Sequence, residues 1–488
     1  PGEKLILSYS DTNAKGEGIS PAYLIGSIRS LYPKLEIEGG AGVRPHKNSI
    51  NNYCYPENPE AGIDLFLEKL VQETEKEHED ILEQADETDA MFGELYSWYL
   101  RNPEYRSRVQ KLVQSAFARK PEDIISQSVA KALYGEVSPY SATRLERFAA
   151  CAFAHFLQYG MKLTERVEYE FKPMDMGNVM HEALESFAEE VRKRGMKWTE
   201  LTEQERNEIA DRCLDNIVAD YGNTVLKSSA RNEYMIERTR RILRRTVWAL
   251  QKQLEQGEFQ PEGFEVTFGG GRIDRVDIME DQNKVYVKVI DYKTGNTSFD
   301  LVYLYHGLQL QLMIYLDGAL RVEQKKYPDK EIIPAGVFYY NIKDPMIQEK
   351  IDADVEAVSA GLMKELKMNG LAQADPELVY RMDSSLGSIP VAFNKDGSFR
   401  KNSSVADRTQ FAVLGRYVRT KIEKIRSSIL EGDAEVSPYE LGKKNACTYC
   451  PYMTVCGFDR RLSGYEFRRL KQFADEEIWK AFAKEVED

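Results

Sequence analysis

Four stretches of the chain carry the residue pattern of β-strands. The longest are residues 264–279 and 285–293, and a polar four-residue turn at 281–284 joins them. Two such runs on either side of a short polar turn predict a β-hairpin. Residues 166–171 and 335–341 are the other two predicted strands.

Between these strands, apolar residues recur at the three- and four-residue spacing of helices. A helix is expected to begin after Ser141, whose side chain is suited to capping, and to run through Cys151. Further helices are predicted at 181–194, 307–320 and 407–430, with a last amphipathic helix near the C-terminus. The order helix, strands, helix, strand predicts an α/β core with a mixed sheet.

The pattern changes near Glu136. The part before it has a short strand pattern at 5–9, a glycine-rich turn at 15–18 and a polar helical stretch at 65–82. A chain of 488 residues is also too long for one ordinary core. We therefore expect one domain at 1–136 and a second at 137–488.

Composition excludes several classes of protein. Hydrophobic residues make up 42% of the chain and charged residues 30%, which is typical of globular proteins and not of disordered ones. No run of eighteen apolar residues occurs, so no membrane span is predicted. The chain begins without Met and has no signal-peptide pattern, so we expect a cytoplasmic segment of a longer polypeptide.

The net charge of −13 argues against a non-specific coat on nucleic acid, since phosphate binding relies on Lys and Arg. It does not exclude an enzyme that acts on DNA, because such an enzyme needs only a local basic track beside an acidic metal site. No Gly-x-x-x-x-Gly-Lys-Ser/Thr phosphate loop occurs, so ATP hydrolysis by this chain is not expected.

The predicted hairpin places charged residues where an apolar strand ends. If the hairpin is symmetric about its turn, Asp274 faces Asp291, and Cβ atoms of such partners lie roughly 4.5–5.5 Å apart. Lys293 shares a face with Asp291, because alternate residues of a strand point the same way. Two carboxylates and an ammonium are costly to bury there unless they pair or bind a cation.

These groups predict a site for Mg²⁺ or Mn²⁺, which prefer oxygen ligands. Such an ion lowers the pKa of a bound water, and Lys293 would orient that water or stabilise developing charge. The alternative is an exposed surface hairpin with an ordinary Asp–Lys pair. The apolar strand, the Gly-x-Ile-Asp segment that ends at Asp274 and the symmetric register favour the metal site.

His181 is the next candidate ligand. It is one of five histidines and begins the predicted helix 181–194, in which Glu185 lies one turn later on the same side. A helical histidine is more often an ordinary core or surface residue than a ligand, but this one belongs to a small set and precedes an acidic segment. We expect His306 to be structural.

Four ordered motifs resemble those of RecB-type nucleases, which belong to the PD-(D/E)xK superfamily. They are Gly177-x-x-x-His181, Gly271-x-Ile-Asp274, Ile290-Asp291-Tyr292-Lys293-Thr294 and Gln311-x-x-x-Tyr315. More closely, most of the chain resembles the B subunits (AddB) of bacterial AddAB ATP-dependent helicase/nucleases. The resemblance implies a restriction-enzyme-like fold, a small mixed sheet flanked by helices, preceded at 1–136 by the end of a helicase-like region.

The resemblance also implies roles for individual residues. The divalent metal would be held by His181, Asp274, Asp291 and the carbonyl of Tyr292, beside Lys293 as the catalytic lysine. Support would come from Gln311 and Tyr315, although their spacing also fits a helical core stripe.

A substrate and a partner follow from the same resemblance. The substrate would be DNA, as single strands from unwound duplex ends during recombinational repair. A protein of this type would cut the strand of 5′-to-3′ polarity. The partner would be an AddA-like helicase/nuclease subunit in a heterodimer.

Three of the six cysteines lie close together, as Cys447-x2-Cys450-x5-Cys456. Three thiolates are one ligand short of a zinc or cubane iron–sulfur site. The AddB-type pattern supplies Cys151 as the fourth ligand of a [4Fe–4S] cluster, with Ala152 where the family more often has proline. Zinc is the competing metal, and a redox-active dithiol is a third interpretation. We expect the remaining cysteines, Cys54 and Cys213, to be ordinary buried thiols.

The sequence therefore favours a Mg²⁺-dependent deoxyribonuclease with a cysteine-ligated C-terminal clamp. The main alternative is a non-catalytic DNA-binding or scaffold module with a structural metal cluster. The presence of Asp274, Asp291 and Lys293 together argues against that alternative. The missing phosphate loop disfavours a translocating ATPase, and the long N-terminal region disfavours a stand-alone exonuclease.

Overall fold

The structure is a computed structural model. It describes residues 23–32, 59–75, 87–116, 124–135, 141–164, 173–220, 229–269, 271–347, 354–462 and 464–487. The strands predicted at 5–9 and 166–171, the glycine-rich turn and Cys54 lie outside these residues. Among the described helices, none combines the length and the apolar character that crossing a lipid bilayer requires.

The chain divides into two compact units, Pro1–Phe117 and Ala118–Asp488. The boundary predicted after Glu136 therefore differs from the observed division. The physical reason is helix α5 (Gln127–Tyr134), whose buried residues Ala130 and Tyr134 belong to a core of the second unit. The backbone N–H of Ile125 also donates to the carbonyl of Gly432 at 3.0 Å.

The described part of the first unit is helical, as expected. It contains α1 (Tyr23–Leu31), α2 (Pro59–Glu75), α3 (Glu87–Arg101) and α4 (Pro103–Ala116). Helices α2 to α4 share a small aromatic core formed by Ile63, Phe66, Leu70, Tyr99 and Val109. The Tyr99 hydroxyl donates to the Pro59 carbonyl at 2.6 Å, which fixes the start of α2 against α3.

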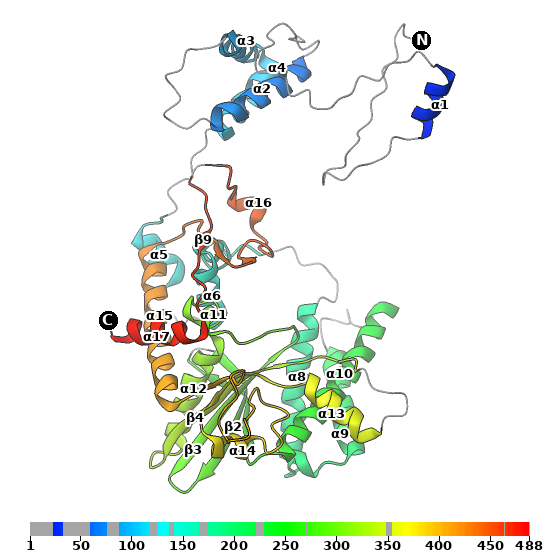
Figure 1. Ribbon diagram of the computed structural model, residues 1–488, viewed down its shortest axis with the longest axis vertical. Coiled ribbons are helices and arrows are strands. Elements are labelled where there is room, and N and C mark those ends of the chain that lie inside the picture. Colours follow the sequence, from blue (N-terminus) through cyan, green and yellow to red (C-terminus); the bar gives the residue numbers. More distant parts are fainter. Residues whose placement is uncertain are drawn as a thin grey trace. The chain divides into compact units, whose positions relative to one another are not determined.

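A six-stranded mixed sheet forms the centre of the second unit (Figure 1). In spatial order its strands are β1 (Gln260–Phe268), β2 (Gly271–Asp281), β3 (Lys284–Lys293), β4 (Glu331–Asn341), β5 (Asn369–Gln373) and β6 (Val405–Ala406). The β3–β4 and β5–β6 pairs are parallel, and the other neighbours are antiparallel. This arrangement confirms the predicted α/β class.

The β2–β3 hairpin has the predicted register. Its pairs run from Asp281↔Lys284 beside the turn to Arg275↔Ile290, without a shift. The single strand predicted at 264–279 is wrong, however, because it is two strands, β1 and β2, that pair with each other. The break falls at the glycine-rich segment 269–271, where apolar alternation stops.

Helices cover both faces of this sheet (Figure 1). On one face, β3 residues Ile290 and Tyr292 pack in a core with α8 (Pro173–Lys193), α9 (Glu203–Asp220) and α10 (Ala230–Glu255). On the other face, Val285, Val287 and Val289 pack with a second helical layer. That layer consists of α5, α6 (Ala142–Ala150), α11 (Leu301–Tyr305), α12 (Gln311–Lys326), α15 (Arg408–Glu431) and α17 (Asp475–Glu487).

Shorter elements complete the described part of the unit. They are α7 (Ala152–His155), a π-helical turn (Phe156–Gly160), a 3₁₀ turn (Trp198–Glu200), α13 (Val355–Glu365), α14 (Pro376–Met382), α16 (Met453–Cys456) and a small sheet of β7 (Tyr439–Leu441), β8 (Lys444–Asn445) and β9 (Arg468–Arg469).

Several helix ends differ from the predicted ones. Helix α8 begins at Pro173, a residue favoured in the first turn, so His181 lies inside the helix and not at its start. The helix predicted at 307–320 begins only at Gln311, because Gly307 adopts a φ of 76° after α11. The helix capped by Ser141 ends before Cys151, whose backbone is extended. Helix α15 begins directly after its predicted first residue, Asp407, which is its N-cap.

A cluster of charged residues is buried within the β2–β3 hairpin. The guanidinium of Arg275 donates to both oxygens of Asp277, at 2.6 and 2.9 Å, and the Lys288 ammonium lies 2.9 Å from one of them. All three residues are buried. Burial by itself raises the pKa of Asp277, but the two cations outweigh that effect and hold the pKa below its usual range.

Replacing Asp277 with asparagine is expected to lower the free energy of unfolding by about 3–5 kcal/mol, because it leaves two buried cations without a counter-charge. Since folding lowers the Asp277 pKa, its stabilisation is present above the ordinary carboxyl pKa and is lost as the pH falls. Urea unfolding followed by tryptophan fluorescence measures the change. The control is Asp281→Asn, which breaks a part-exposed pair with Arg381 and should cost under about 1 kcal/mol. Equal losses in the two variants would contradict this prediction.

Candidate functional site

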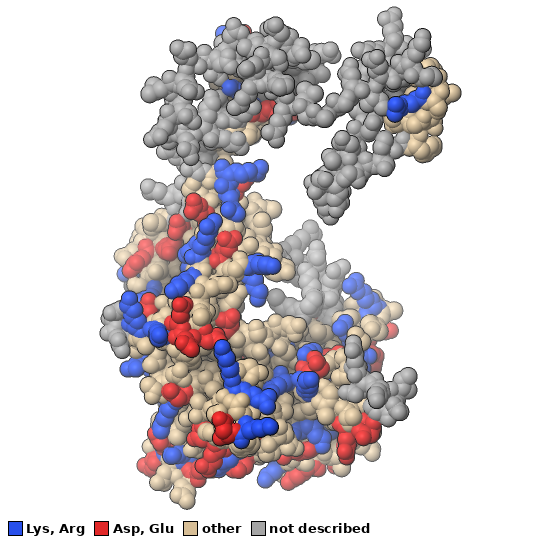
Figure 2. Space-filling view, in the orientation of Figure 1, with Lys and Arg blue, Asp and Glu red and all other residues tan. Residues whose placement is uncertain are grey.

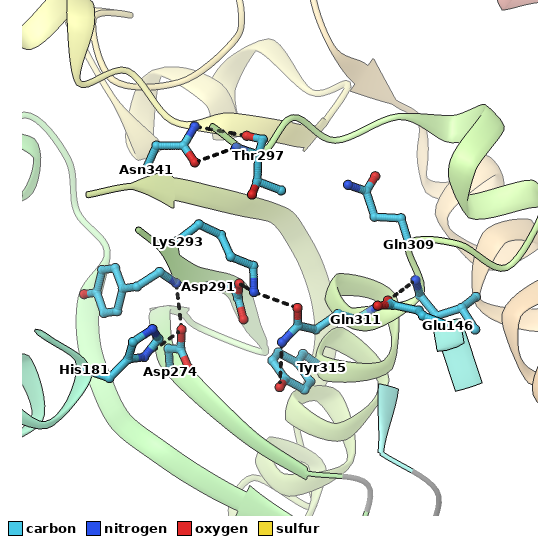
Figure 3. Close-up of polar contacts among 12 residues, drawn as sticks. Glu146, His181, Asp274, Asp291, Lys293, Thr297, Gln309, Gln311, Tyr315 and Asn341 are labelled. Atoms are coloured by element: carbon cyan, nitrogen blue, oxygen red, sulfur yellow. Dashed lines mark hydrogen bonds and ion pairs between the residues drawn. The ribbon is translucent and has the colours of Figure 1, made fainter. Parts of the chain in front are cut away.

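Asp274 and Asp291 lie on neighbouring strands at the same end of the hairpin. The register that pairs Arg275 with Ile290 continues to place them opposite each other, and their exposed fractions are 7% and 1%. Asp274 Oδ2 accepts a hydrogen bond from the backbone N–H of Tyr292 at 2.7 Å (Figure 3). Burial and then the negative charge of Asp274 raise the pKa of Asp291 to about 7, against the opposing effect of Lys293.

Lys293 joins this pair to helix α12. Its Nζ lies 2.5 Å from Asp291 Oδ2 and donates to Gln311 Oε1 at 2.8 Å. Gln311 Nε2 in turn donates to the Tyr315 hydroxyl at 2.9 Å, so the four side chains form one polar chain (Figure 3). The structure thus brings Gln311 and Tyr315 to the acidic end of the hairpin, as the resemblance implied.

A glycine is favoured where β2 begins. Gly271 has a φ of 149°, which residues other than glycine rarely adopt. A Cβ atom there would make only an ordinary van der Waals contact with the Tyr315 ring, at 3.5 Å, so the backbone conformation decides the residue. This backbone requirement explains the glycine three residues before Asp274.

His181 reaches the same carboxylates from α8. Its Nδ1 lies 3.4 Å from Asp274 Oδ2 and 3.7 Å from Glu265 Oε1. Burial lowers the pKa of His181, but the neighbouring carboxylates of Asp274 and Glu265 outweigh that effect and raise the pKa to about 10. No contact between His181 and Glu185 is found among the described residues. The pKa of Glu185 is raised by burial and then by Glu265.

Glu265 is a site residue that the sequence interpretation missed. His181, Glu265 and Asp274 are the one group of potential ligands within 4.8 Å of one another in the described parts of the chain. Glu265 lies on β1 opposite Asp274, has a positive φ of 49° and pairs with Arg272 at 2.5 Å. The prediction of one strand over 264–279 hid this residue, because in a single strand Glu265 lies nine positions along the chain from Asp274 and not opposite it.

Glu146 is a second unpredicted residue near the site. It lies on α6, and its Oε1 accepts hydrogen bonds from the backbone N–H groups of Leu310 at 2.7 Å and Gln311 at 3.0 Å (Figure 3). Burial raises its pKa to about 7 even though these two hydrogen bonds act in the opposite direction. Nothing local in the sequence pairs Glu146 with residues more than 160 positions away.

The four cysteines of the predicted cluster line one hollow. Cys151 comes from the break between α6 and α7, and Cys447, Cys450 and Cys456 come from the C-terminal segment around α16. Burial and then its three neighbouring cysteines raise the pKa of Cys447 to about 11. None of the five described cysteines is in a disulfide.

Further contacts hold the two cysteine-bearing segments together. The backbone N–H of Phe153 donates to the Glu435 carbonyl at 2.9 Å, and the Tyr452 hydroxyl donates to the Leu163 carbonyl at 3.0 Å. The guanidinium of Arg468 donates to the Ala149 carbonyl, which is at the end of α6. Cys213 is buried in the α8–α10 core and does not line the hollow.

The model of the PD-(D/E)XK nuclease superfamily matches residues 139–457. The chain belongs to this superfamily. The matched range contains every candidate metal ligand, Lys293, Gln311, Tyr315 and the four clustered cysteines. The superfamily model therefore spans both the sheet that carries the acidic residues and the segment that closes the cysteine hollow.

Relatives match along the whole chain, and they are B subunits of ATP-dependent helicase/deoxyribonucleases. The one from Lachnoclostridium phytofermentans is 39% identical, over 100% of this chain and 42% of its own length. Those from Alkaliphilus metalliredigens and Thermoanaerobacter sp. are 32% and 31% identical, each over 99% of this chain and 43% of their own length. The chain thus spans less than half of these relatives.

Proposed function

We propose that the chain is the nuclease part of an AddB-type protein and hydrolyses DNA phosphodiesters with Mg²⁺ or Mn²⁺. The observation that carries the proposal is the buried Asp274–Asp291 pair with Lys293 and His181 around it. Burial and then repulsion by Asp274 raise the pKa of Asp291, and a divalent cation relieves that repulsion. The donor set of carboxylates and an imidazole fits such a cation.

The proposed ligands are His181, Asp274, Asp291 and the carbonyl of Tyr292. Glu265 is a further candidate because it lies within reach of the same atoms. A bound divalent ion would supply a water of lowered pKa and neutralise phosphate charge. Lys293, held by Asp291 and Gln311, has its ammonium group fixed beside these ligands, where it would orient the attacking water or stabilise charge on the phosphate.

Helix α10 offers a basic surface for the DNA strand. Charges of both signs are mixed over the face shown in Figure 2. Between α9 and α10, however, a hollow of about 540 Å³ is lined by six arginines together with Tyr234 and Trp248. Arg238 and Arg245 have no acidic partner among the described residues, and Arg245 lies 5.6 Å from the Trp248 ring. Arginine interleaved with aromatic rings is the pattern of single-strand binding surfaces.

The surface is connected to the site through the sheet. Arg241 of α10 pairs with Asp344 at 2.6 Å, and Asp344 follows β4, whose last residue pairs with Lys293. The proposed path of a strand bound along α10 runs toward the end of the sheet that carries the acidic residues. The proposed substrate is single-stranded DNA from duplex ends unwound by an AddA-like partner, with the strand of 5′-to-3′ polarity cut at this site.

The proposed second cofactor is a structural [4Fe–4S] cluster held by Cys151, Cys447, Cys450 and Cys456. These thiols meet in one hollow, and that convergence supports a shared metal group. Zinc sites with four cysteines commonly use two C-x2-C pairs. Here one C-x2-C pair, one spaced cysteine and one remote cysteine favour a cluster over zinc.

At limiting Mg²⁺, cleavage is expected to increase with pH between about 6 and 9, because protons compete with the metal for its ligands. The raised pKa values of Asp291 and His181, about 7 and about 10, mean that both groups bind protons in this range. The Mg²⁺ concentration for half-maximal rate should fall by up to about tenfold per pH unit for each proton displaced. Rates titrated with Mg²⁺ at each pH measure this, and a half-maximal concentration independent of pH would contradict it.

The function is tested by digestion of single-stranded DNA labelled at either end. We expect cleavage with Mg²⁺ or Mn²⁺, none after chelation, and recovery when the metal is returned. The pattern of products from 5′-labelled and 3′-labelled strands gives the polarity. Cleavage that survives chelation would refute the metal dependence. DNA binding without cleavage under both metals would support the rival function, a non-catalytic DNA-binding module.

A further inference from the structure

Helix α12 begins without a cap of its own. Its N-cap position is Leu310, which makes no side-chain capping bond, and its first turn contains no acidic residue. A leucine is a poor N-cap because it cannot accept hydrogen bonds from the first free N–H groups of the helix. Yet Leu310 is fully buried, so water does not satisfy those groups either.

The missing cap is supplied from another helix. Glu146 Oε1 accepts from the N–H groups of Leu310 and Gln311, and Glu146 comes from the middle of α6 (Figure 3). A carboxylate at the N-terminus of a helix also has a favourable interaction with the helix dipole. The cost of burying the Glu146 carboxylate is evident in its pKa, which burial raises. An apolar residue at position 146 would avoid the cost of burying a charge. Packing alone therefore does not account for a carboxylate there.

Gln311 is the residue through which Glu146 reaches the site. Its backbone N–H is fixed by Glu146, while its side chain accepts from Lys293 and donates to Tyr315. A shift at the first turn of α12 therefore moves the oxygen that holds the Lys293 ammonium. Among the described residues, Glu146 makes no hydrogen bond with Asp274 or His181. Its hydrogen-bonded link to the site is Gln311, and its charge also acts on Lys293 and Asp291 without contact.

Helix α6, which carries Glu146, is itself fixed by the cysteine-bearing segments. Helix α6 starts at the Ser141 cap and ends at Cys151, and the guanidinium of Arg468 holds the carbonyl of Ala149 in its last turn. Arg147, next to Glu146, lies 5.6 Å from the Tyr452 ring and 4.0 Å from the Cys450 sulfur. The position of Glu146 is thus set at the same helix end that contributes Cys151.

We propose that Glu146 is a positioning residue of the nuclease site. Glu146 fixes the N-terminus of α12 to α6, and through Gln311 it also fixes the position of the Lys293 ammonium. This inference rests on the proposed nuclease function. The proposed role of the Glu146 carboxylate is distinct from metal binding, because the group that Glu146 positions is Lys293.

The test compares Glu146→Gln with the native chain and with Gln311→Ala. Glutamine keeps the size of the side chain but is a weaker, uncharged acceptor. We expect Glu146→Gln to lower kcat by roughly ten- to a hundredfold, the scale of a small misplacement of a catalytic group. The Mg²⁺ requirement, the KM for single-stranded DNA and the visible absorption of the cluster should not change. Glu146→Asp, which keeps the charge on a shorter side chain, should recover part of the rate.

A double-mutant comparison separates positioning from general destabilisation. If Glu146 acts through Gln311, adding Glu146→Gln to Gln311→Ala lowers kcat little further, whereas independent effects multiply. The matched control is Asp375→Ala, which removes the side-chain cap of α14, a helix that carries no site residue. It should lower stability and leave kcat unchanged.

The outcomes distinguish this inference from the function on which it rests. An active native chain with an unchanged kcat in Glu146→Gln, or with effects that multiply fully, overturns the positioning role alone. A raised Mg²⁺ requirement in Glu146→Gln also overturns it, since that result makes Glu146 part of the metal site. A native chain that cleaves with neither Mg²⁺ nor Mn²⁺ overturns the proposed function itself.

Discussion

Replacing Lys293 with alanine is expected to reduce DNA cleavage by on the order of 10²–10³-fold while the protein stays folded. The reason is that the Lys293 ammonium is the one cation held directly against Asp291 and Gln311 among the described residues. Its removal takes away the group that orients water or stabilises charge on the phosphate. Lys293 is also partly exposed, so its loss leaves no large cavity.

The expected effect on metal binding separates Lys293 from the carboxylates. Lys293→Ala should bind Mn²⁺ at least as well as the native chain, because a positive charge beside Asp291 has been removed. Asp291→Ala should lose both cleavage and tight metal binding, since it deletes a proposed ligand.

Cleavage of end-labelled single-stranded DNA and Mn²⁺ titration are the two measurements for the Lys293 prediction. Lys284→Ala is the control, because Lys284 is an exposed lysine at the far end of the same strand. Cleavage by Lys293→Ala at the native rate would refute the proposed site. Loss of cleavage in Lys284→Ala would show that the loss in Lys293→Ala reflects damage to strand β3 and not removal of the Lys293 ammonium.

Replacing Cys447 with alanine is expected to loosen or unfold the second unit rather than only to slow its chemistry. Cys151 and Cys447 lie about 300 positions apart, so a shared cluster closes a very large loop in the unfolded chain. A covalent cross-link of that length contributes on the order of 5 kcal/mol in the chain-entropy model, which is comparable to the whole stability of many domains. Helix α6, which ends at Cys151, also carries Glu146, so the effect should extend to the nuclease site.

Thermal unfolding, limited proteolysis and visible absorption of anaerobically purified protein measure the Cys447 effect. The matched control is Cys213→Ala, which removes a buried thiol from the α8–α10 core and should keep the absorption band and most of the stability. Native stability and activity in Cys447→Ala would refute the clamp. Zinc in place of iron, with the same loss of stability, would keep the clamp and change the cofactor.

The meeting of Asp274, Asp291 and Lys293 was predictable because the hairpin is short and regular, whereas the roles of His181, Gln311 and Tyr315 were implied by resemblance. The alternation of β3 places Asp291 and Lys293 on one face, and a two-residue turn fixes the register that brings Asp274 opposite them. Four-residue spacing likewise places Gln311 and Tyr315 on one side of α12. The meeting of the four cysteines was implied by resemblance, since sequence alone does not relate Cys151 to the C-terminal segment.

The errors arose where local pattern competes with packing. The predicted strand 264–279 merged β1 and β2, because the glycines between them interrupt a run that otherwise stays β-like. That merger concealed Glu265, which faces Asp274 only after the chain has turned back on itself. The observed division lies before α5 and not after Glu136, because α5, a short amphipathic helix, packs against a part of the chain far away in sequence.

Residue patterns alone were enough to predict the α/β class, the hairpin register, the carboxylate–lysine set and the close spacing of three cysteines. These features depend on residue periods and spacings within short segments. The folded structure was needed to show that Glu265 and His181 approach Asp274, that Glu146 caps α12, and that Arg275 and Lys288 share Asp277 in a buried cluster. Several of these contacts join residues that are far apart in the sequence. The elements that carry them are placed by the burial of the two faces of the sheet, and no local pattern predicts that packing.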